Sequence, residues 1–352
     1  MGPFAPPAPT LSSPPCHRPT PRANLSAMPL AIRVHAQGGP EALQCDHVPL
    51  PVPAPGEALV RHTALGVNFI DTYHRSGLYP LPKLPHAIGV EGVGVVEAVG
   101  RGVSTVRVGD RVGYGGGDPG AYAEYRCVDS ARLIALPESI SDETAAAVLL
   151  RGMTAEYLIR RCFKVEAGMP VLVHAAVGGV GMLMCQWLAH LGAEVIGTVG
   201  TDAKAELARA NGCQHVIVYT REDFALHVRQ ITHDRGVPVV FDGVGKATFA
   251  GSLRSLARRG LLISFGNASG PPDPLDVLQL GKHGSVYLTR PRLHDYVASR
   301  AELELSANAV FDAVAKGGLR PRIGARFPMA AAADAHRALE ARTTTGSVLL
   351  VP

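Results

Sequence analysis

A glycine-rich segment between a short aliphatic strand and a helix is the part of the sequence best suited to bind a ligand. The run Val171–Val173 predicts a strand, and it leads into the turn Ala175–Gly181 and then into a helix. Amides at a helix start, aided by the helix dipole, favour a bound pyrophosphate, and glycines let the backbone approach it closely. Ala176 replaces the first glycine of the usual fingerprint, but the order of strand, helix and second strand still predicts a dinucleotide site rather than a mere tight turn.

The end of the second strand distinguishes NAD from NADP. NAD-binding proteins place a carboxylate there, on the ribose 2′-hydroxyl. The segment 195–201 has none, whereas Lys204 follows on the first turn of the next helix and Tyr219 ends the third strand. Both side chains could reach a 2′-phosphate, where a charge-assisted hydrogen bond contributes about 1.5 to 3 kcal/mol. The pattern favours NADP, although Asp202 beside Lys204 weakens the attraction and either residue alone could be a solvated side chain.

The elements that position these residues change character along the chain. Short strands flanked by Gly, Pro or Asp predict a β-rich first part, with strands at 58–67, 92–99, 111–114 and 121–128. After Ser141, helices alternate with aliphatic strands, which is typical of βαβ units and a parallel sheet. These strands are expected at 171–173, 194–196, 215–218, 239–241 and 261–264. The last apolar strand, 347–351, needs a sheet to join, and the β-rich first part is its natural host.

We therefore expect an α/β protein in which a doubly wound parallel sheet is inserted into a β-rich catalytic domain, with a ligand cleft between the two. The expected boundaries are 28–152 and 292–352 for the two parts of the catalytic domain and 153–291 for the nucleotide-binding domain. Residues 1–27 are rich in proline and contain no acidic residue, so we expect a disordered tail without a part in function. A second methionine, Met28, leaves open whether the tail belongs to the mature protein.

The composition excludes several classes of protein. Apolar residues make up 47% of the 352 residues, which is enough for a core and excludes wholesale disorder. The net charge is 34 − 30 = +4 without a basic run, so a dedicated nucleic-acid-binding protein is disfavoured. The uncharged stretch 167–193 is broken by glycines, so we interpret it as strand, turn and helix rather than a membrane span. The widely spaced cysteines form no zinc clip and favour a reduced, cytoplasmic setting.

Several further motifs occur together in this chain: Gly38–Glu41, the block Gly66–Tyr73 with Arg75–Pro80, Ser264–Asn267 and Thr289–Pro291. With the glycine turn, they strongly resemble the NADPH:quinone oxidoreductases, the zinc-free, zeta-crystallin-like branch of the medium-chain dehydrogenase/reductase superfamily. The likeness runs from about residue 28 to residue 352. It implies a Rossmann-type domain inserted in a GroES-like catalytic domain, NADPH as the cofactor, and a homodimer that pairs through a strand near 284–288.

Two positions distinguish this branch from the zinc-dependent alcohol dehydrogenases of the same superfamily. Those enzymes place a cysteine shortly after a Gly-Val pair and a histidine in a Gly-His-Glu motif. This chain has Asn68 and Val90 at these positions. An amide oxygen and an isopropyl group cannot hold a catalytic zinc ion, so we expect no metal site.

The resemblance also implies which residues contact the ligands. Tyr73 would point at the reacting ring, Tyr157 would flank the nicotinamide, and Arg342 would contact the cofactor from the turn before the last strand. The full cofactor-binding set that we expect is Phe69, Ile70, Asp71, Thr72, Tyr73, Tyr157, Gly178, Gly179, Val180, Gly181, Gly200, Thr201, Lys204, Tyr219, Val244, Phe265, Gly266, Asn267 and Arg342.

The expected reaction is reduction of a quinone, or another conjugated carbonyl compound, by hydride transfer from NADPH. Tyr73 and Asn68 are the expected catalytic residues, as donors that orient the acceptor; Tyr73 could equally serve packing and cofactor contact alone. When a quinone accepts the hydride, one oxygen becomes a phenolate, a stable anion that solvent can protonate. No strong general acid is therefore required. Two alternatives stay open: reduction of activated alkenes such as enones and 2-alkenals, and a non-catalytic NADPH-binding or RNA-binding protein.

Overall fold

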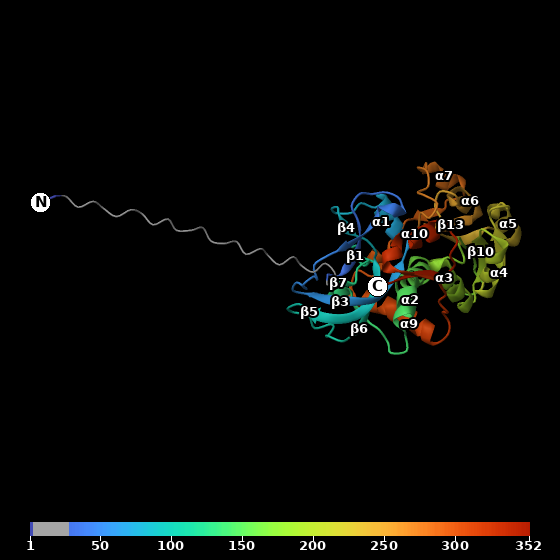
Figure 1. Ribbon diagram of the computed structural model, residues 1–352. Coiled ribbons are helices and arrows are strands. Elements are labelled where there is room, and N and C mark those ends of the chain that lie inside the picture. Colours follow the sequence, from blue (N-terminus) through green and yellow to red (C-terminus); the bar gives the residue numbers. More distant parts are fainter. Residues whose placement is uncertain (3–27) are drawn as a thin grey trace.

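The computed structural model describes residues 1–2 and 28–352, and the chain folds around two large sheets (Figure 1). The expected disordered tail, residues 1–27, lies almost wholly outside the described residues. In Figure 1, the early blue and cyan strands gather on one side and the yellow-green to orange elements on the other. The chain ends close to the blue strands, so the last segment returns to the first part of the protein.

The larger sheet has seven strands and contains both early and late segments of the chain. Its order is β15–β16–β3–β5–β6–β8, and β7 pairs separately with β3. The terminal strand joins this sheet as expected, because β16 runs antiparallel to β3 with Val348 opposite Val67. A separate three-stranded sheet has the order β2–β1–β4. The strands of both are β1 (Leu30–Val34), β2 (Leu43–His47), β3 (Glu57–Val67), β4 (His86–Ala87), β5 (Glu91–Val99), β6 (Arg111–Gly115), β7 (Tyr125–Asp129), β8 (Ile134–Ala135), β15 (Ile323–Pro328) and β16 (Ser347–Val351).

The other large sheet has six strands, all parallel, in the order β11–β10–β9–β12–β13–β14. The chain order reverses between β9 and β12, and in such sheets ligands bind at the carboxyl ends of the strands beside that point. Every strand that the alternating pattern predicted is present, with longer bounds for most. The strands are β9 (Pro170–Val173), β10 (Glu194–Val199), β11 (His215–Val218), β12 (Val237–Asp242), β13 (Leu256–Ser264) and β14 (Tyr287–Thr289).

Helix α2 joins the two halves of the molecule. It packs against α3 and α9 and also against β3, β5 and β16. The largest core cluster accordingly contains residues of both sheets together with these helices. The helices are α1 (Phe69–Ser76), α2 (Asp142–Tyr157), α3 (Gly179–His190), α4 (Asp202–Ala210), α5 (Phe224–Ile231), α6 (Phe249–Ser255), α7 (Leu278–Lys282), α8 (Leu293–Tyr296), α9 (Arg300–Ala315) and α10 (Ala332–Glu340), with short helical turns η2 (Pro40–Ala42), η3 (Ser130–Arg132), η4 (Leu158–Cys162) and η5 (Met329–Ala331). Of the helices in the described ranges, none has the length and apolar character needed to cross a bilayer.

One predicted strand is wrong in its first half. The pattern at 121–128 predicted a continuous strand, but the strand β7 starts at Tyr125. Before it, the backbone turns inward: Tyr122 N donates to the Ile88 oxygen and Ile32 N donates to the Tyr122 oxygen, both at 2.8 Å. The inward turn buries the Tyr122 ring completely, and its hydroxyl becomes part of the polar network under α1.

Candidate active site

The glycine turn lies where β9 ends and α3 begins, beside the point where the strand order reverses. Gly178 is the N-cap of α3, and no side chain caps the helix. A Cβ atom at Gly181 would lie 2.2 Å from the Ala175 carbonyl oxygen, and one at Gly179 would lie 2.6 Å from Arg151 Nε. Gly181 therefore requires glycine, and a larger residue at Gly179 would displace the Arg151 side chain. The amides at the start of α3, with Val180 among them, are available to an anionic group.

The turn before the last strand lies directly against the glycine turn. Gly346 N donates to the Val177 carbonyl oxygen at 3.1 Å, and Gly178 and Gly346 form an isolated parallel bridge. This contact brings Arg342, at the beginning of the same turn, into the neighbourhood of the nucleotide-binding sheet.

Lys204 and Tyr219, singled out by the sequence, and Arg342, singled out by the resemblance, lie together at one end of the site. Lys204 Nζ donates to the Arg342 carbonyl oxygen at 2.6 Å, and Arg342 Nη1 donates to the Tyr219 hydroxyl at 3.3 Å. Burial and the nearby Arg342 charge lower the pKa of Lys204. Asp202 is engaged elsewhere, since it pairs with Arg221 at 2.6 Å.

This cluster has the chemistry of a phosphate site. Within the described part of the chain, neither Lys204 nor Arg342 forms an ion pair with a carboxylate. Gly200 lies beside Tyr219: a Cβ atom at Gly200 would be 3.7 Å from the Tyr219 hydroxyl oxygen. Next to it, Thr201 Oγ1 accepts a hydrogen bond from Lys204 N. Two cations without acidic partners, beside a hydroxyl donor, suit a dianionic phosphate.

Tyr73 and Asn267 meet at the other end of the site. Asn267 N donates to the Tyr73 hydroxyl oxygen at 2.9 Å, which leaves the hydroxyl's own proton free for another acceptor. Burial raises the pKa of Tyr73 to about 12, so this group stays protonated at neutral pH. A cavity of about 290 Å³ opens beside it, lined by Phe69, Thr72, Tyr73, Ser76, Leu78, Asn267, Ala268, Gly270 and Glu340.

Asn68 faces the protein rather than this cavity. Its Nδ2 donates to Glu91 Oε2 at 2.9 Å and more weakly to the Gly66 oxygen at 3.4 Å. These bonds occupy the amide that was expected to donate to the acceptor. Val90, at the second position compared with the zinc enzymes, is buried and apolar. Over residues 28–352, no group of three or more His, Cys, Asp and Glu side chains could hold a metal ion.

A buried ion pair lies between the two ends of the site. Arg151 Nη1 contacts Glu91 Oε2 at 3.1 Å, and their side chains are 5% and 0% exposed. Leu150 N donates to the other Glu91 oxygen at 2.8 Å, and Arg151 also donates to the Val67 carbonyl oxygen. Burial raises the pKa of Glu91, and the Arg151 charge opposes that rise. The pair thus connects α2, the strands β3 and β5, Asn68 and the glycine turn.

Asp71, on the first turn of α1, fixes this helix through buried hydrogen bonds. Its Oδ2 accepts from Asn68 N at 2.7 Å and from the Tyr122 hydroxyl at 2.9 Å. Tyr122 in turn contacts His336 Nε2 at 3.2 Å, and Arg75 Nη1 lies 3.0 Å from His336 Nδ1. Burial raises the pKa of Asp71 to about 7. Asp71, one of the residues expected to contact the cofactor, is fully buried and positions the helix that carries Tyr73.

Most of the remaining predicted residues follow the parallel strands or lie on α1, whereas Tyr157 ends α2. Tyr157 is buried and its ring stacks on Tyr296 at a centroid distance of 4.4 Å. Val244 N donates to Asp242 Oδ1 at 2.8 Å at the end of β12. Phe265 and Gly266 follow β13, and the Phe265 amide donates to the Asp242 carbonyl oxygen at 2.8 Å. Ile70 is half-buried on the first turn of α1.

Sequence reasoning gave no role to four residues that build this site: Glu91, Arg151, Tyr79 and Arg290. Arg290 Nη1 donates to the Ser264 carbonyl oxygen at 2.6 Å and Nη2 to the Tyr79 hydroxyl at 3.0 Å. The only signal in the sequence was that Tyr79 and Arg290 belong to motifs shared with the similar family.

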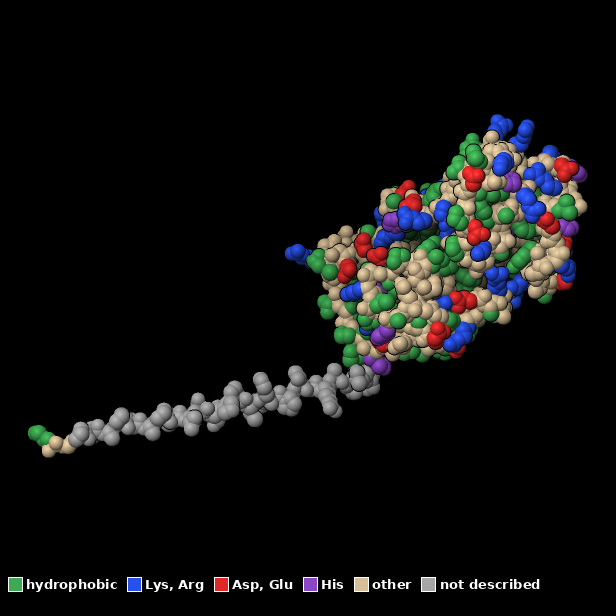
Figure 2. Space-filling model, turned by 90° about the horizontal axis from the view of Figure 1, so that it is seen from above, with side chains coloured by type: hydrophobic (Ala, Val, Ile, Leu, Met, Phe, Trp, Pro, Cys, Tyr) green, Lys and Arg blue, Asp and Glu red, His purple; other side chains and the backbone are tan. Residues whose placement is uncertain are grey.

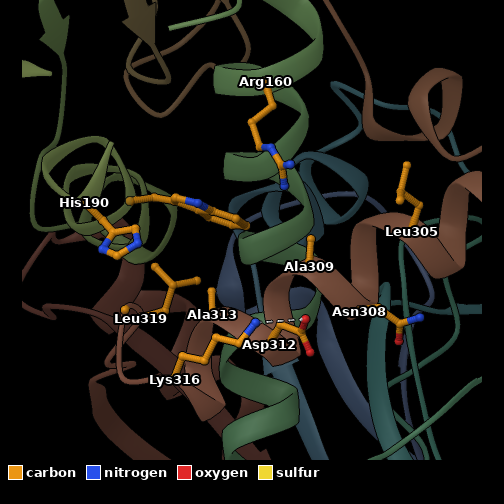
Figure 3. Close-up of a pocket in the computed structure, with 11 residues that line it drawn as sticks. Arg160, His190, Leu305, Asn308, Ala309, Asp312, Ala313, Lys316 and Leu319 are labelled. Carbon is orange, nitrogen blue, oxygen red and sulfur yellow. Dashed lines mark hydrogen bonds and ion pairs between the residues drawn. The ribbon is translucent and has the colours of Figure 1, made fainter. Parts of the chain in front are cut away.

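A second cavity, of about 520 Å³, lies between α3 and α9 (Figure 3). Arg160, His190 and Lys316 surround it, and Leu305 and Ala309 provide apolar walls. It is separate from the candidate active site, because none of the predicted cofactor or substrate residues lines it.

The chain is similar to known proteins over most of its length. A family model for the alcohol dehydrogenase GroES-like domain matches residues 54–138, and one for zinc-binding dehydrogenases matches residues 179–294. A quinone oxidoreductase of Pseudomonas aeruginosa is 46% identical over 321 residues, which are 91% of this chain and 99% of the relative. A 2-haloacrylate reductase of Burkholderia is 44% identical over 331 residues, 92% and 99% of the two chains.

A solved structure extends the similarity to three dimensions. The quinone oxidoreductase of Escherichia coli, complexed with NADPH, is 43% identical and matches with a TM-score of 0.90, covering 92% of this chain and 100% of that one. With the two family models, this match confirms the expected α/β fold with a GroES-like domain and a Rossmann-type domain.

Replacing Arg151 by methionine tests the buried ion pair. The Arg151→Met variant leaves the Glu91 carboxylate buried without a cation, so the free energy of unfolding should fall by about 3–5 kcal/mol in urea titrations. The double variant Glu91→Gln/Arg151→Met should recover part of this loss, because no charge then stays buried alone.

The matched control is Arg326→Met, which removes a surface pair with Glu143 whose side chains are 50% and 42% exposed. Such a pair contributes about 0–1 kcal/mol. Equal losses in the Arg151 and Arg326 variants would contradict the central part assigned to the buried pair.

Proposed function

We propose that this chain, which belongs to the quinone oxidoreductase family of the medium-chain dehydrogenase/reductase superfamily, reduces quinones by direct hydride transfer without zinc. Its relatives identify it as an NADPH-dependent quinone oxidoreductase, and we infer the absence of zinc and the residues that perform the reaction from the site. The observation that carries it is the convergence of Lys204, Tyr219 and Arg342, two cations and a hydroxyl, beside the glycine turn. This cluster fits the 2′-phosphate that distinguishes NADPH from NADH.

The donor set along the site fits NADPH from end to end. The amides at Gly179 and Val180 would hold the pyrophosphate, and Tyr157 and Asn267 would border the nicotinamide half. When bound, NADPH supplies a hydride to an electron-poor acceptor. The chain's own residues bind the cofactor, hold the acceptor next to it and stabilise the charge that the acceptor gains.

Tyr73 is the residue that we place against the acceptor. Its hydroxyl is protonated at neutral pH, accepts from Asn267 N, and keeps a proton to donate into the cavity beside it. Solvent can protonate the resulting phenolate, so a donor suffices and a strong acid is not required.

The residues at the two positions compared with zinc enzymes support a reaction without that metal. The Asn68 amide donates to Glu91, and Val90 has no atom that could ligate zinc. In the zinc enzymes the metal polarises the substrate oxygen; here hydroxyl and amide groups would do so by donating hydrogen bonds to that oxygen.

Reduction of activated alkenes is the second candidate function. The 44% identical relative from Burkholderia is named a 2-haloacrylate reductase, and a haloacrylate is an alkene made electron-poor by its carboxylate and halogen. The same hydride geometry would serve such a substrate. The RNA-binding alternative has less support, since acidic and basic side chains are interspersed on the face shown in Figure 2.

Initial rates with two cofactors and two acceptor panels test the function. We expect steady oxidation of NADPH, followed at its absorbance near 340 nm, with benzoquinones and naphthoquinones, and slower rates with enones and 2-haloacrylate. NADH should serve poorly. Turnover of alkenes only would establish the second candidate instead, and a preference for NADH would contradict the phosphate site.

Removal of the Lys204 charge tests the phosphate site itself. Lys204→Ala should raise the KM for NADPH about tenfold, the effect of losing roughly 1.4 kcal/mol of charge-assisted bonding, and leave the KM for NADH unchanged. Lys316→Ala is the control, since this lysine is 77% exposed and pairs with Asp312 on α9. A uniform loss with both cofactors would show that Lys204 supports the fold rather than the phosphate.

We also propose a homodimer joined along β14, the edge strand of the parallel sheet. Tyr287 and Leu288 on this strand are 61% and 37% exposed, and an open edge with apolar side chains favours pairing. Light scattering should give twice the chain mass, and Leu288→Lys should shift it towards one chain. Leu305→Lys, at an exposed leucine of α9, should leave the mass unchanged; a wild-type monomer would overturn the proposal.

The sequence also supports two further assignments as proposals. The domain boundaries 28–152, 153–291 and 292–352 are proposed on the ground that β8 and β9, and likewise β14 and β15, belong to different sheets. A cytoplasmic location rests on the spacing of the cysteines alone.

A further inference from the structure

Arg290 is a cation beside Tyr79 and Asn267 that has no acidic partner in the described part of the chain. It follows β14, and its guanidinium crosses from the parallel sheet to the turn after α1, where Nη2 donates to the Tyr79 hydroxyl at 3.0 Å. Among the described residues no carboxylate pairs with it, whereas Arg292, two positions further on, pairs with Asp295 at 3.2 Å. A guanidinium held by a carbonyl and a hydroxyl keeps its full charge for a ligand.

The charge of Arg290 reaches the residues around the acceptor. Tyr79 packs edge to face on Tyr73 with 5.3 Å between ring centroids. Burial raises the pKa of both Tyr73 and Tyr157, and the Arg290 charge opposes the rise at each of them. With its Oδ1 and Nδ2 exchanged, Asn267 also accepts from Arg290 Nη2 at 3.3 Å.

We propose that Arg290, acting through the Tyr79 hydroxyl that it holds, stabilises the negative charge that develops on the acceptor oxygen. This inference rests on the proposed function. Tyr79 accepts from Arg290 and Tyr73 accepts from Asn267 N, so each hydroxyl has one proton left to donate. Two such donors beside a fixed cation form the donor set that an oxyanion requires. Arg290 is thus a positioning residue, and it favours acceptors whose reduction places charge on oxygen.

The hydride, electrons and proton of the proposed quinone reduction are all accounted for. The quinone gains a hydride, which carries two electrons, from NADPH, and one of its oxygens becomes a phenolate. A proton from solvent then completes the hydroquinone. NADPH is oxidised and the quinone is reduced by the same two electrons, and Arg290 gives up no proton because its guanidinium remains charged throughout.

A phenol that ionises near neutral pH, 4-nitrophenol, measures the anion preference without turnover. Bound to the wild-type protein, it should ionise at lower pH than in water, as followed by the absorbance of the phenolate. In Arg290→Met this pH should rise by about one unit, which corresponds to a tenfold loss of anion binding. Arg292→Met is the matched control and should titrate like the wild type.

Kinetics give the second measurement. Arg290→Met should lower kcat/KM for quinones about tenfold and leave the KM for NADPH unchanged, and Arg290→Lys should lie between the two. Since Arg290 also holds the Ser264 carbonyl, Tyr79→Phe provides a variant that leaves this contact in place. It should show the same losses in titration and in rate.

The outcomes separate the two proposals. A wild-type protein that binds the phenolate through Arg290 but reduces no quinone would overturn the function and leave the anion site standing. A protein that reduces quinones while Arg290→Met and Tyr79→Phe match Arg292→Met in both measurements would overturn the inference alone.

Discussion

The buried pair of Glu91 and Arg151 is the constraint on which the rest of the site depends. Two opposite charges removed from water are costly unless they meet each other and further hydrogen-bond partners. Here Glu91 receives bonds from Arg151, from the Leu150 amide and from Asn68, and Arg151 also bonds the Val67 carbonyl. Because Leu150 and Arg151 belong to α2, Glu91 to β5, Val67 to β3 and Asn68 to the start of α1, the pair fixes these four elements relative to one another.

The same pair explains why the glycine turn occupies its place. Arg151 lies so close to Gly179 that a Cβ atom there would collide with the guanidinium group. The start of α3 therefore packs directly on Arg151, whose partner Glu91 accepts from the Asn68 amide at the start of the helix that carries Tyr73. The turn at Gly346 also contacts the glycine turn, because Gly346 N donates to the Val177 carbonyl oxygen. The nucleotide-binding sheet is thus held between the first and the last segments of the chain.

Charge is distributed unevenly along the candidate site. Lys204 and Arg342 at one end, and Arg290 at the other, are cations without acidic partners in the described part of the chain, whereas Asp202 and Asp295 are neutralised by neighbouring arginines. A fixed excess of positive charge binds a phosphate in the ground state and an oxyanion as it forms. Tyr73, a buried tyrosine with a raised pKa, is a protonated donor beside the cavity.

The sequence by itself determined the features that depend on local pattern. Glycines between a strand and a helix, aliphatic strands alternating with helices, and a terminal strand in need of a sheet were sufficient to predict the fold, the dinucleotide turn and the pairing of β16 with the first part of the chain. The first half of the strand expected at 121–128 was wrong because an alternating pattern cannot show that the Tyr122 backbone bonds Ile88 and Ile32 instead, nor that its hydroxyl meets Asp71.

Only the tertiary structure decided which side chains meet across the cleft. Arg290 and Tyr79 are 211 positions apart, and Arg151 and Glu91 are 60 apart. Periodicity reports which face of an element is buried, but it contains no information about the partner that faces it. Such partners are selected when helices and sheets pack, and so the chemistry of this site was visible in residue types while its geometry was not.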